Sequence, residues 1–146
     1  MAWTFYNSNG EALVQHAESE ATKAEMEAET AVAHFVPPDL VKNSPGVAKA
    51  WCTFDGTGTV ALDQNYNISG LTDLGGTGNY RVAIATDVST TMYALVLAAG
   101  VNGGRCYADH KGRANLAVDT FDVQTSDEDG SAVDADAVCA AVFGDA

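Results

Sequence analysis

Apolar and polar residues alternate with a period of two over most of residues 51–146, a pattern typical of half-buried β-strands. Such runs occupy residues 51–54, 59–62, 66–69, 80–85, 93–98, 105–108, 116–123 and 138–143. Turn signals such as Asp55-Gly56, Lys111-Gly112 and Asp129-Gly130 separate the runs. Short strands at this spacing are typical of an antiparallel β-sandwich or barrel. We therefore predict a mainly β fold, with an antiparallel β-domain over residues 51–146.

Residues 1–50 have a different pattern, and we expect them to form an N-terminal extension for attachment and oligomerisation. Two short apolar runs, residues 3–6 and 12–14, flank a turn sequence whose Asn and Gly residues tolerate positive φ angles. This arrangement predicts a β-hairpin. A lone hairpin is marginal in water, so its aromatic side chains need a surface to cover them. Trp3, Phe5 and Tyr6 are therefore candidate attachment residues, packed either on the chain's own domain or on another protein.

Residues 17–33 are rich in Ala, Glu and Lys and predict a helix. Small and apolar residues recur there at heptad spacing and form a candidate oligomer seam: Ala17, Ala21, Ala24, Ala28, Ala31 and Phe35. A competing signal, Thr22-Lys23-Ala24-Glu25, fits a capping box and predicts a shorter helix that begins near Lys23. Pro37-Pro38 ends either helix, because proline lacks the amide donor.

The charge balance excludes two classes of partner. The 146 residues carry 20 acids and 7 bases, which gives a net charge of −13. Binding to nucleic acid or to an anionic membrane surface requires clustered Lys and Arg, so we expect neither. No apolar run reaches the length of about 18 residues that a spanning helix needs, and the N-terminal residues lack a signal-peptide pattern. We expect synthesis in a cytoplasm, with Cys52, Cys106 and Cys139 as small buried hydrophobes.

The sequence offers little catalytic chemistry. His16 and His34 lie in the extension and His110 in a turn, with no serine in a nucleophile-elbow motif and no cysteine near a histidine. An acidic stretch contains Asp127, Asp129 and Asp134, but the twelve-residue calcium-loop pattern is absent, and solvated turn residues explain it more simply. We therefore predict no catalytic residue, no metal and no cofactor.

Several segments together resemble a recurring block of tailed-phage virion proteins of the tail-fibre or appendage type. They are WTFYNSNGEAL (3–13), AEMEA (24–28), AKAW (48–51), FDGTGTVA (54–61), YNISGLTD (66–73) and GTGNYRV (76–82). The resemblance implies a non-enzymatic and commonly trimeric component of the virion, made in the host cytoplasm and in contact with other capsid or tail proteins. This chain is much shorter than a typical fibre, which favours a short capsid or tail appendage.

Two hypotheses of function follow. In the first, the chain is a structural phage component, anchored by its N-terminal region with the β-domain facing outward. In the second, it is a carbohydrate-binding module that recognises a host surface glycan. Sugar stacking would use exposed rings, and the candidates are Trp51, Tyr66, Tyr80, Tyr93 and Tyr107. Exposed rings that line a groove would favour glycan binding, whereas rings in the core or between subunits would favour a purely structural role.

Overall fold

The structure, a computed structural model, describes residues 5–6, 9, 12–13, 20–30, 36–38, 40–102 and 104–145. The chain divides into two compact units, Met1–Ser44 and Pro45–Ala146, which we call the N-terminal unit and the β-unit. Within the described ranges, no helix has the length and apolar character that crossing a membrane requires.

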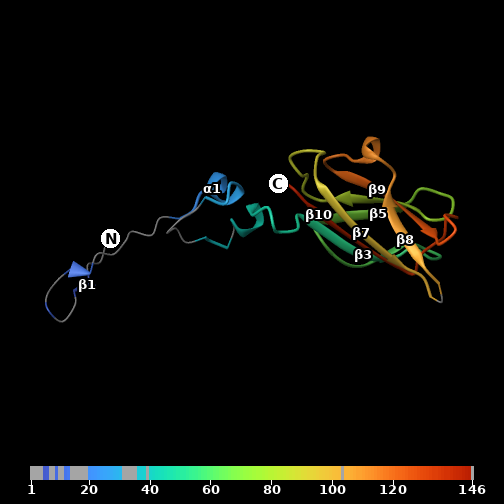
Figure 1. Cartoon of the computed structure of the whole chain (residues 1–146), viewed down its shortest axis with the longest axis horizontal. Helices are drawn as coiled ribbons and strands as arrows, with labels where there is room; N and C mark the ends of the chain where they lie inside the picture. Colours follow the sequence, from blue (N-terminus) through green and yellow to red (C-terminus); the bar gives the residue numbers. More distant parts are fainter. Residues whose placement is uncertain are drawn as a thin grey trace. The chain divides into compact units, whose positions relative to one another are not determined.

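The β-unit is an antiparallel β-sandwich, which confirms the predicted fold class (Figure 1). One sheet has the order β4-β3-β10-β7 and consists of Ala61–Tyr66, Ala50–Asp55, Ala137–Phe143 and Ala94–Gly100. The other has the order β5-β6-β9-β8 and consists of Ile68–Asp73, Asn79–Ile84, Thr120–Asp127 and Cys106–His110. Figure 1 shows β3, β10 and β7 running side by side in the first sheet.

Strict alternation in the inner strands builds the core between the sheets. Burial alternates along β3 and β10, so that every second side chain points inward. Phe54 of β3 and Tyr80 of β6 are both buried, and their rings meet edge to face with centroids 5.2 Å apart. Ring pairs of this geometry add to the stability that burial alone provides. The two sheets are therefore joined by aromatic as well as aliphatic packing.

Asn67 fixes the corner between β4 and β5. Its φ angle of 55° lies in the left-handed region, which asparagine tolerates better than most residues. Its side-chain amide donates to the carbonyl oxygens of Lys49 and Thr86 at 3.0 Å each, and its Oδ1 accepts from the Thr86 amide at 2.8 Å. One side chain thus ties the start of the β-unit to the loop that follows β6.

A second polar cluster lies where β6 begins. The Tyr80 hydroxyl lies 3.1 Å from both the Gly56 carbonyl oxygen and Asp134 Oδ1, and the Gly78 amide donates to the same carboxylate oxygen at 2.6 Å. Gly78 has a φ of 69°, and a Cβ there would come within 2.5 Å of the Thr125 carbonyl oxygen. Only glycine fits this position.

The N-terminal unit contains the predicted hairpin and a short helix. β1 (Phe5–Tyr6) pairs antiparallel with β2 (Ala12–Leu13), which confirms the hairpin. α1 is only Lys23–Glu27, and a capping box between Thr22 and Glu25 starts it, as the competing signal predicted. A short 3-10 helix, Val41–Asn43, follows.

The heptad helix over 17–33 is wrong in the part that the structure describes. Ala21 precedes α1, Ala28 is its C-cap, and Glu29 has a φ of 53°, which ends the helix. Of the described seam positions only Ala24 therefore lies within a helix. Ala17, Ala31 and Phe35 lie outside the described residues. The local capping interaction outweighed the weak alanine spacing, because alanines bury too little surface to hold a longer helix together.

Three strands begin two or more residues later than predicted. The predicted runs 59–62 and 66–69 became β4 and β5, which start two residues later and extend further. The run predicted at 116–123 begins as strand only at Thr120, after the 3-10 turn Arg113–Asn115. In each case polar residues such as Asn65, Thr72 and Thr125 extend the ladders, because backbone pairing continues beyond the apolar pattern.

Candidate functional site

The strongest candidate for a site is the outward surface of the β4-β3-β10-β7 sheet. Cys52 and Phe54 of β3 point into the core, so Trp51 and Thr53 point outward. In β10, Val138, Ala140 and Val142 are buried, which leaves Cys139 and Ala141 outward. In β7 the outward positions include Val96 and Ala98. Three neighbouring strands thus present small or apolar side chains to the solvent.

Strand register places these side chains in two rows across the sheet. The first row is Tyr66, Trp51, Ala141 and Val96, and the second is Gln64, Thr53, Cys139 and Ala98. We call these eight residues the apolar face. Trp51 is 39 % exposed, Tyr66 50 % and Val96 57 %, which are high values for side chains of this size. Contiguous exposed apolar surface of this kind marks an interaction site more often than a structural one.

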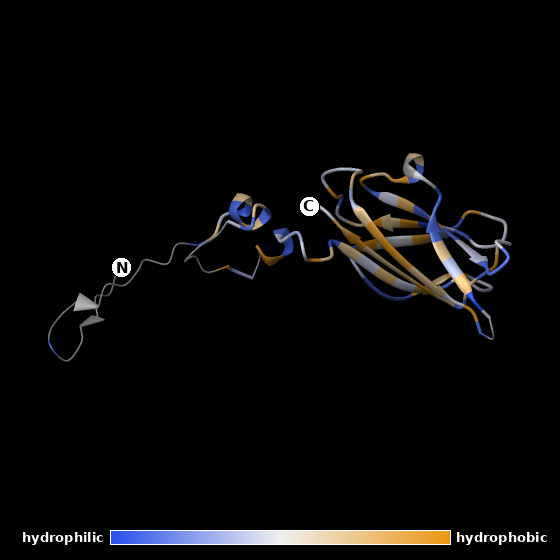
Figure 2. Ribbon diagram, viewed as in Figure 1, coloured by the Kyte–Doolittle hydropathy of each residue, from blue (hydrophilic) through white to orange (hydrophobic). Residues whose placement is uncertain are grey.

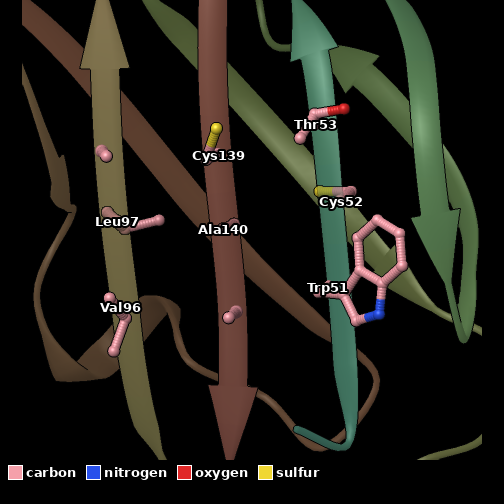
Figure 3. A pocket seen from close by; sticks show the side chains of 9 residues that line it. Trp51, Cys52, Thr53, Val96, Leu97, Cys139 and Ala140 are labelled. Atoms are coloured by element: carbon pink, nitrogen blue, oxygen red, sulfur yellow. The ribbon is translucent and has the colours of Figure 1, made fainter.

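The apolar face is hollowed above β10. An open hollow of about 190 Å³ lies between Trp51 and Thr53 on one side and Val96 and Ala98 on the other. Figure 3 shows Cys139 between these two walls, on the middle strand. The hollow exists because β10 carries only small outward side chains there, while Trp51 and Val96 rise on the strands beside it. A bulky apolar group would fit it.

Neither row of the apolar face carries a charged residue, although the chain has a net charge of −13. Figure 2 shows β7 coloured as hydrophobic over most of its length. The outward surface of the other sheet is different: Arg81 and Asp122, on neighbouring strands, form a two-pronged ion pair with distances of 2.7 and 3.0 Å. The Asp122 carboxylate raises the pKa of the Arg81 guanidinium above its usual value.

The cysteines do not share one environment, which corrects the expectation that all three are buried. Cys52 is buried, Cys106 is partly exposed, and Cys139 is exposed on the apolar face. Burial, with the neighbouring Cys139 as a smaller cause, raises the pKa of the Cys52 thiol to about 12. Cys139 is exposed because burial alternates along β10 although its residues are apolar on both surfaces, and position 139 is one that faces outward.

The five aromatic candidates for sugar stacking divide into two groups. Trp51, Tyr66 and Tyr107 are exposed, while Tyr80 and Tyr93 are buried. Burial raises the pKa of both Tyr80 and Tyr93 to about 12, with Asp134 and Asp119 as respective further causes. Trp51 and Tyr66 are opposite each other on the apolar face, so they alone of the candidates share a surface with the hollow.

The acidic segment after β9 has structural roles. Asp127 Oδ1 accepts from the amides of Asp129 and Ser131 at 3.0 and 2.8 Å, which closes the turn. Asp134 holds the cluster around Tyr80. Across the described residues, no three His, Cys, Asp or Glu side chains gather as metal ligands. His110 ends β8, where its Nδ1 accepts from the Gly112 amide at 3.0 Å.

The structure describes two of the three candidate attachment residues. Phe5 and Tyr6 form β1, and Trp3 is not among the described residues. Their role stays a prediction, as does association through the alanine positions.

The residue pattern did contain a signal for the apolar face. β10 and β7 have the sequences AVCAAVF and ALVLAAG, in which no position is polar. A strand with one solvated surface should alternate, and an unbroken apolar run indicates burial on both surfaces. Comparisons with family models, with curated proteins and with solved structures found no match to this chain.

Proposed function

We propose that this chain is a non-enzymatic structural component of a phage particle, a tail-fibre-like or capsid- or tail-attached appendage protein. In this proposal the N-terminal region anchors the chain and the β-unit faces outward, with three copies associated. The sequence resemblance set out above provides the link to phage particles. The observation that carries an assembly role is the uncharged apolar face, because contiguous exposed apolar surface is typical of sites that bind another protein.

The alternative is a carbohydrate-binding module, and the exposed pair of Trp51 and Tyr66 favours it. Sugar recognition needs polar groups beside the stacking rings, because each sugar hydroxyl must keep its hydrogen bonds. Of the described residues that line the hollow, Thr53 supplies a hydroxyl beside Trp51, whereas Val96, Ala98, Cys139 and Ala141 offer no strong hydrogen-bonding group. This apolar surrounding supports a protein partner over a glycan.

The main experiment is quantitative mass spectrometry of purified phage particles, combined with antibody labelling in electron micrographs. We expect the chain in intact particles, in a copy number divisible by three, with labels at one defined position on the head or tail. Particles that lack the chain would contradict the proposal.

A second experiment tests anchoring. Trp3→Ala combined with Phe5→Ala should remove the chain from particles, because buried aromatic anchors contribute most of the binding free energy at interfaces. The melting temperature of the β-unit should not change. Thr4→Ala is the control and should be incorporated normally. Glycan binding that Trp51→Ala abolishes, together with normal incorporation of every variant, would favour the alternative.

A further inference from the structure

We infer that the apolar face binds the apolar face of a second copy of this chain, so that two sandwiches pack sheet against sheet around a two-fold axis. The inference rests on the geometry of the β-unit and holds whether or not the chain is part of a virion. In this contact the Trp51 side chain of each copy lies over the hollow above β10 of the other copy.

Charge is the first argument for a second copy. Two chains of net charge −13 repel each other, and the repulsion is strongest where carboxylates are brought together. The opposite sheet carries carboxylates at paired positions. Asp109 of β8 is paired with Gln124 of β9, and Asp122 of β9 is paired with Arg81 of β6. The two rows of the apolar face contain no ionisable side chain other than the Tyr66 hydroxyl and the Cys139 thiol. Two copies that meet through these rows keep carboxylates at the edge of the contact, where Asp55 is the next outward residue of β3.

Shape is the second argument. The same face carries a projection, Trp51 on β3, and a hollow, above β10, and these strands are direct neighbours. A two-fold axis between β3 and β10 places the Trp51 side chain of each copy over the hollow of the other. An isologous contact requires one surface to supply both halves of the fit. Sheets packed in this way lie about 10 Å apart, as the two sheets of a sandwich do.

The size of the face sets the strength of the contact. Strands lie about 4.8 Å apart and rise about 3.3 Å per residue, so the two rows on four strands present a flat area of about 250 Å². Two faces then bury about 500 Å², and more when side-chain relief is included, against about 1,200 Å² at the lower limit of stable interfaces. The pair should therefore be reversible and dependent on concentration.

The two-fold contact is separate from the proposed trimer. A trimer held through its N-terminal units leaves three apolar faces free, and two trimers that pair through them make a hexamer. As its concentration rises, the full-length protein should therefore change from one species to another of twice the mass.

The test combines sedimentation velocity with alkylation of the native thiols, on the full-length protein from about 1 µM to about 1 mM, the range of weak complexes. We expect the mass to double over this range. The alkylation rate of Cys139, measured by digestion and mass spectrometry, should fall at least about fivefold over the same range because its thiol lies in the contact. The rate of Cys106, on the other sheet, should not change.

Two variants locate the contact. Val96→Glu adds a charge to the apolar face and should raise the dissociation constant at least about tenfold and restore rapid alkylation of Cys139 at high concentration. Gln124→Glu adds the same charge to an exposed, outward position of β9 and should leave both unchanged. Circular dichroism melting of both variants checks that folding is intact.

Three results would overturn the inference. The first is a mass independent of concentration, and the second is doubling without protection of Cys139. The third is doubling that survives Val96→Glu in a folded variant. None of them bears on the presence of the chain in particles, so failure here is distinguishable from failure of the proposed function.

Discussion

The two outer surfaces of the sandwich are built on the same framework and have opposite chemistry. Both belong to four-stranded antiparallel sheets, in which burial alternates along the inner strands β3 and β6. The apolar face leaves Trp51 and Val96 in contact with solvent, whereas the other surface presents the Arg81–Asp122 ion pair and Gln124. The inward positions of a strand thus determine the fold, and the outward positions are free to determine what the fold binds.

On the outward surface of the β5-β6-β9-β8 sheet, Arg81 and Asp122 satisfy each other's charge and hydrogen bonds. Asp122 is 3 % exposed and accepts both guanidinium contacts from Arg81, so its carboxylate needs no external partner. A charge that is paired in this way resists displacement by a binding partner, because the partner must first break the pair. The apolar face has no such internal compensation, and this difference makes it the candidate binding surface.

The largest expected effect comes from breaking the framework that both surfaces share. Phe54→Ala removes a fully buried ring from the contact with Tyr80 and should lower the free energy of unfolding by about 3–5 kcal/mol. Denaturant unfolding followed by fluorescence measures this. Tyr66→Ala, on the apolar face, is the exposed counterpart and should cost less than about 1 kcal/mol. Equal losses would mean that the apolar face is part of the core.

A slightly smaller effect is expected at the start of β6. Gly78→Ala forces a Cβ against the Thr125 and Val133 carbonyl oxygens at a positive φ, so we expect a loss of about 3 kcal/mol in unfolding free energy. Gly75→Ala also has a positive φ but meets open space, and it serves as the control for backbone strain alone. The difference between their melting temperatures isolates the steric clash.

Alkaline pH should separate the buried from the exposed tyrosines. The pKa of Tyr80 and Tyr93 is about 12 in the folded chain and near 10 in an unfolded one. The unfolded state therefore loses these protons first, and the stability that they confer is complete below pH 10 and disappears as the pH rises toward 12. Melting temperatures measured from pH 9 to 12 should fall accordingly. Tyr80→Phe should reduce that fall, and an unchanged slope would contradict the assignment.

The smallest effects on stability, and the sharpest test of the two surfaces, come from exchanging their residues. Val96→Gln and Gln124→Val should each change the unfolding free energy by less than about 0.5 kcal/mol, because both positions are exposed. Retention on a hydrophobic-interaction column should fall for the first variant and rise for the second. Retention unaffected by Val96→Gln would show that the apolar face does not dominate the surface.

The inward pattern could be predicted from the sequence, because it repeats every second residue and has one cause. Alternation in residues such as Cys52, Phe54, Val138 and Val142 located the strands and the fold class. The candidate site could not be predicted in the same way. It depends on which outward positions of distant strands become neighbours, and the pairing of Trp51 with Ala141 joins residues 90 positions apart in the chain.

The helix α1 shows that a local sequence signal can be predictive where a long-range pattern is not. Two signals competed over residues 17–33, and the local one, the Thr22–Glu25 capping box, determined where α1 begins. The heptad spacing describes a contact with another helix, and such a contact does not fix local conformation until a partner supplies buried area. A capping box needs only the four residues that form it.

The position of β3 also determines how the β-unit transmits force. β3 follows directly after Lys49, whose carbonyl Asn67 holds, and is bonded to β4 on one side and β10 on the other. Suppose that force is applied to residues 45–49 along β3 while the far end of the sandwich is held. The hydrogen bonds of β3 to β4 and to β10 are then loaded in shear and must break together. A pull between Lys49 and Gly144 instead separates β3 from β10 one bond at a time, because β10 ends beside the start of β3. A β-unit tethered by its N-terminal linker and pulled at its opposite end is therefore loaded along its mechanically stronger direction.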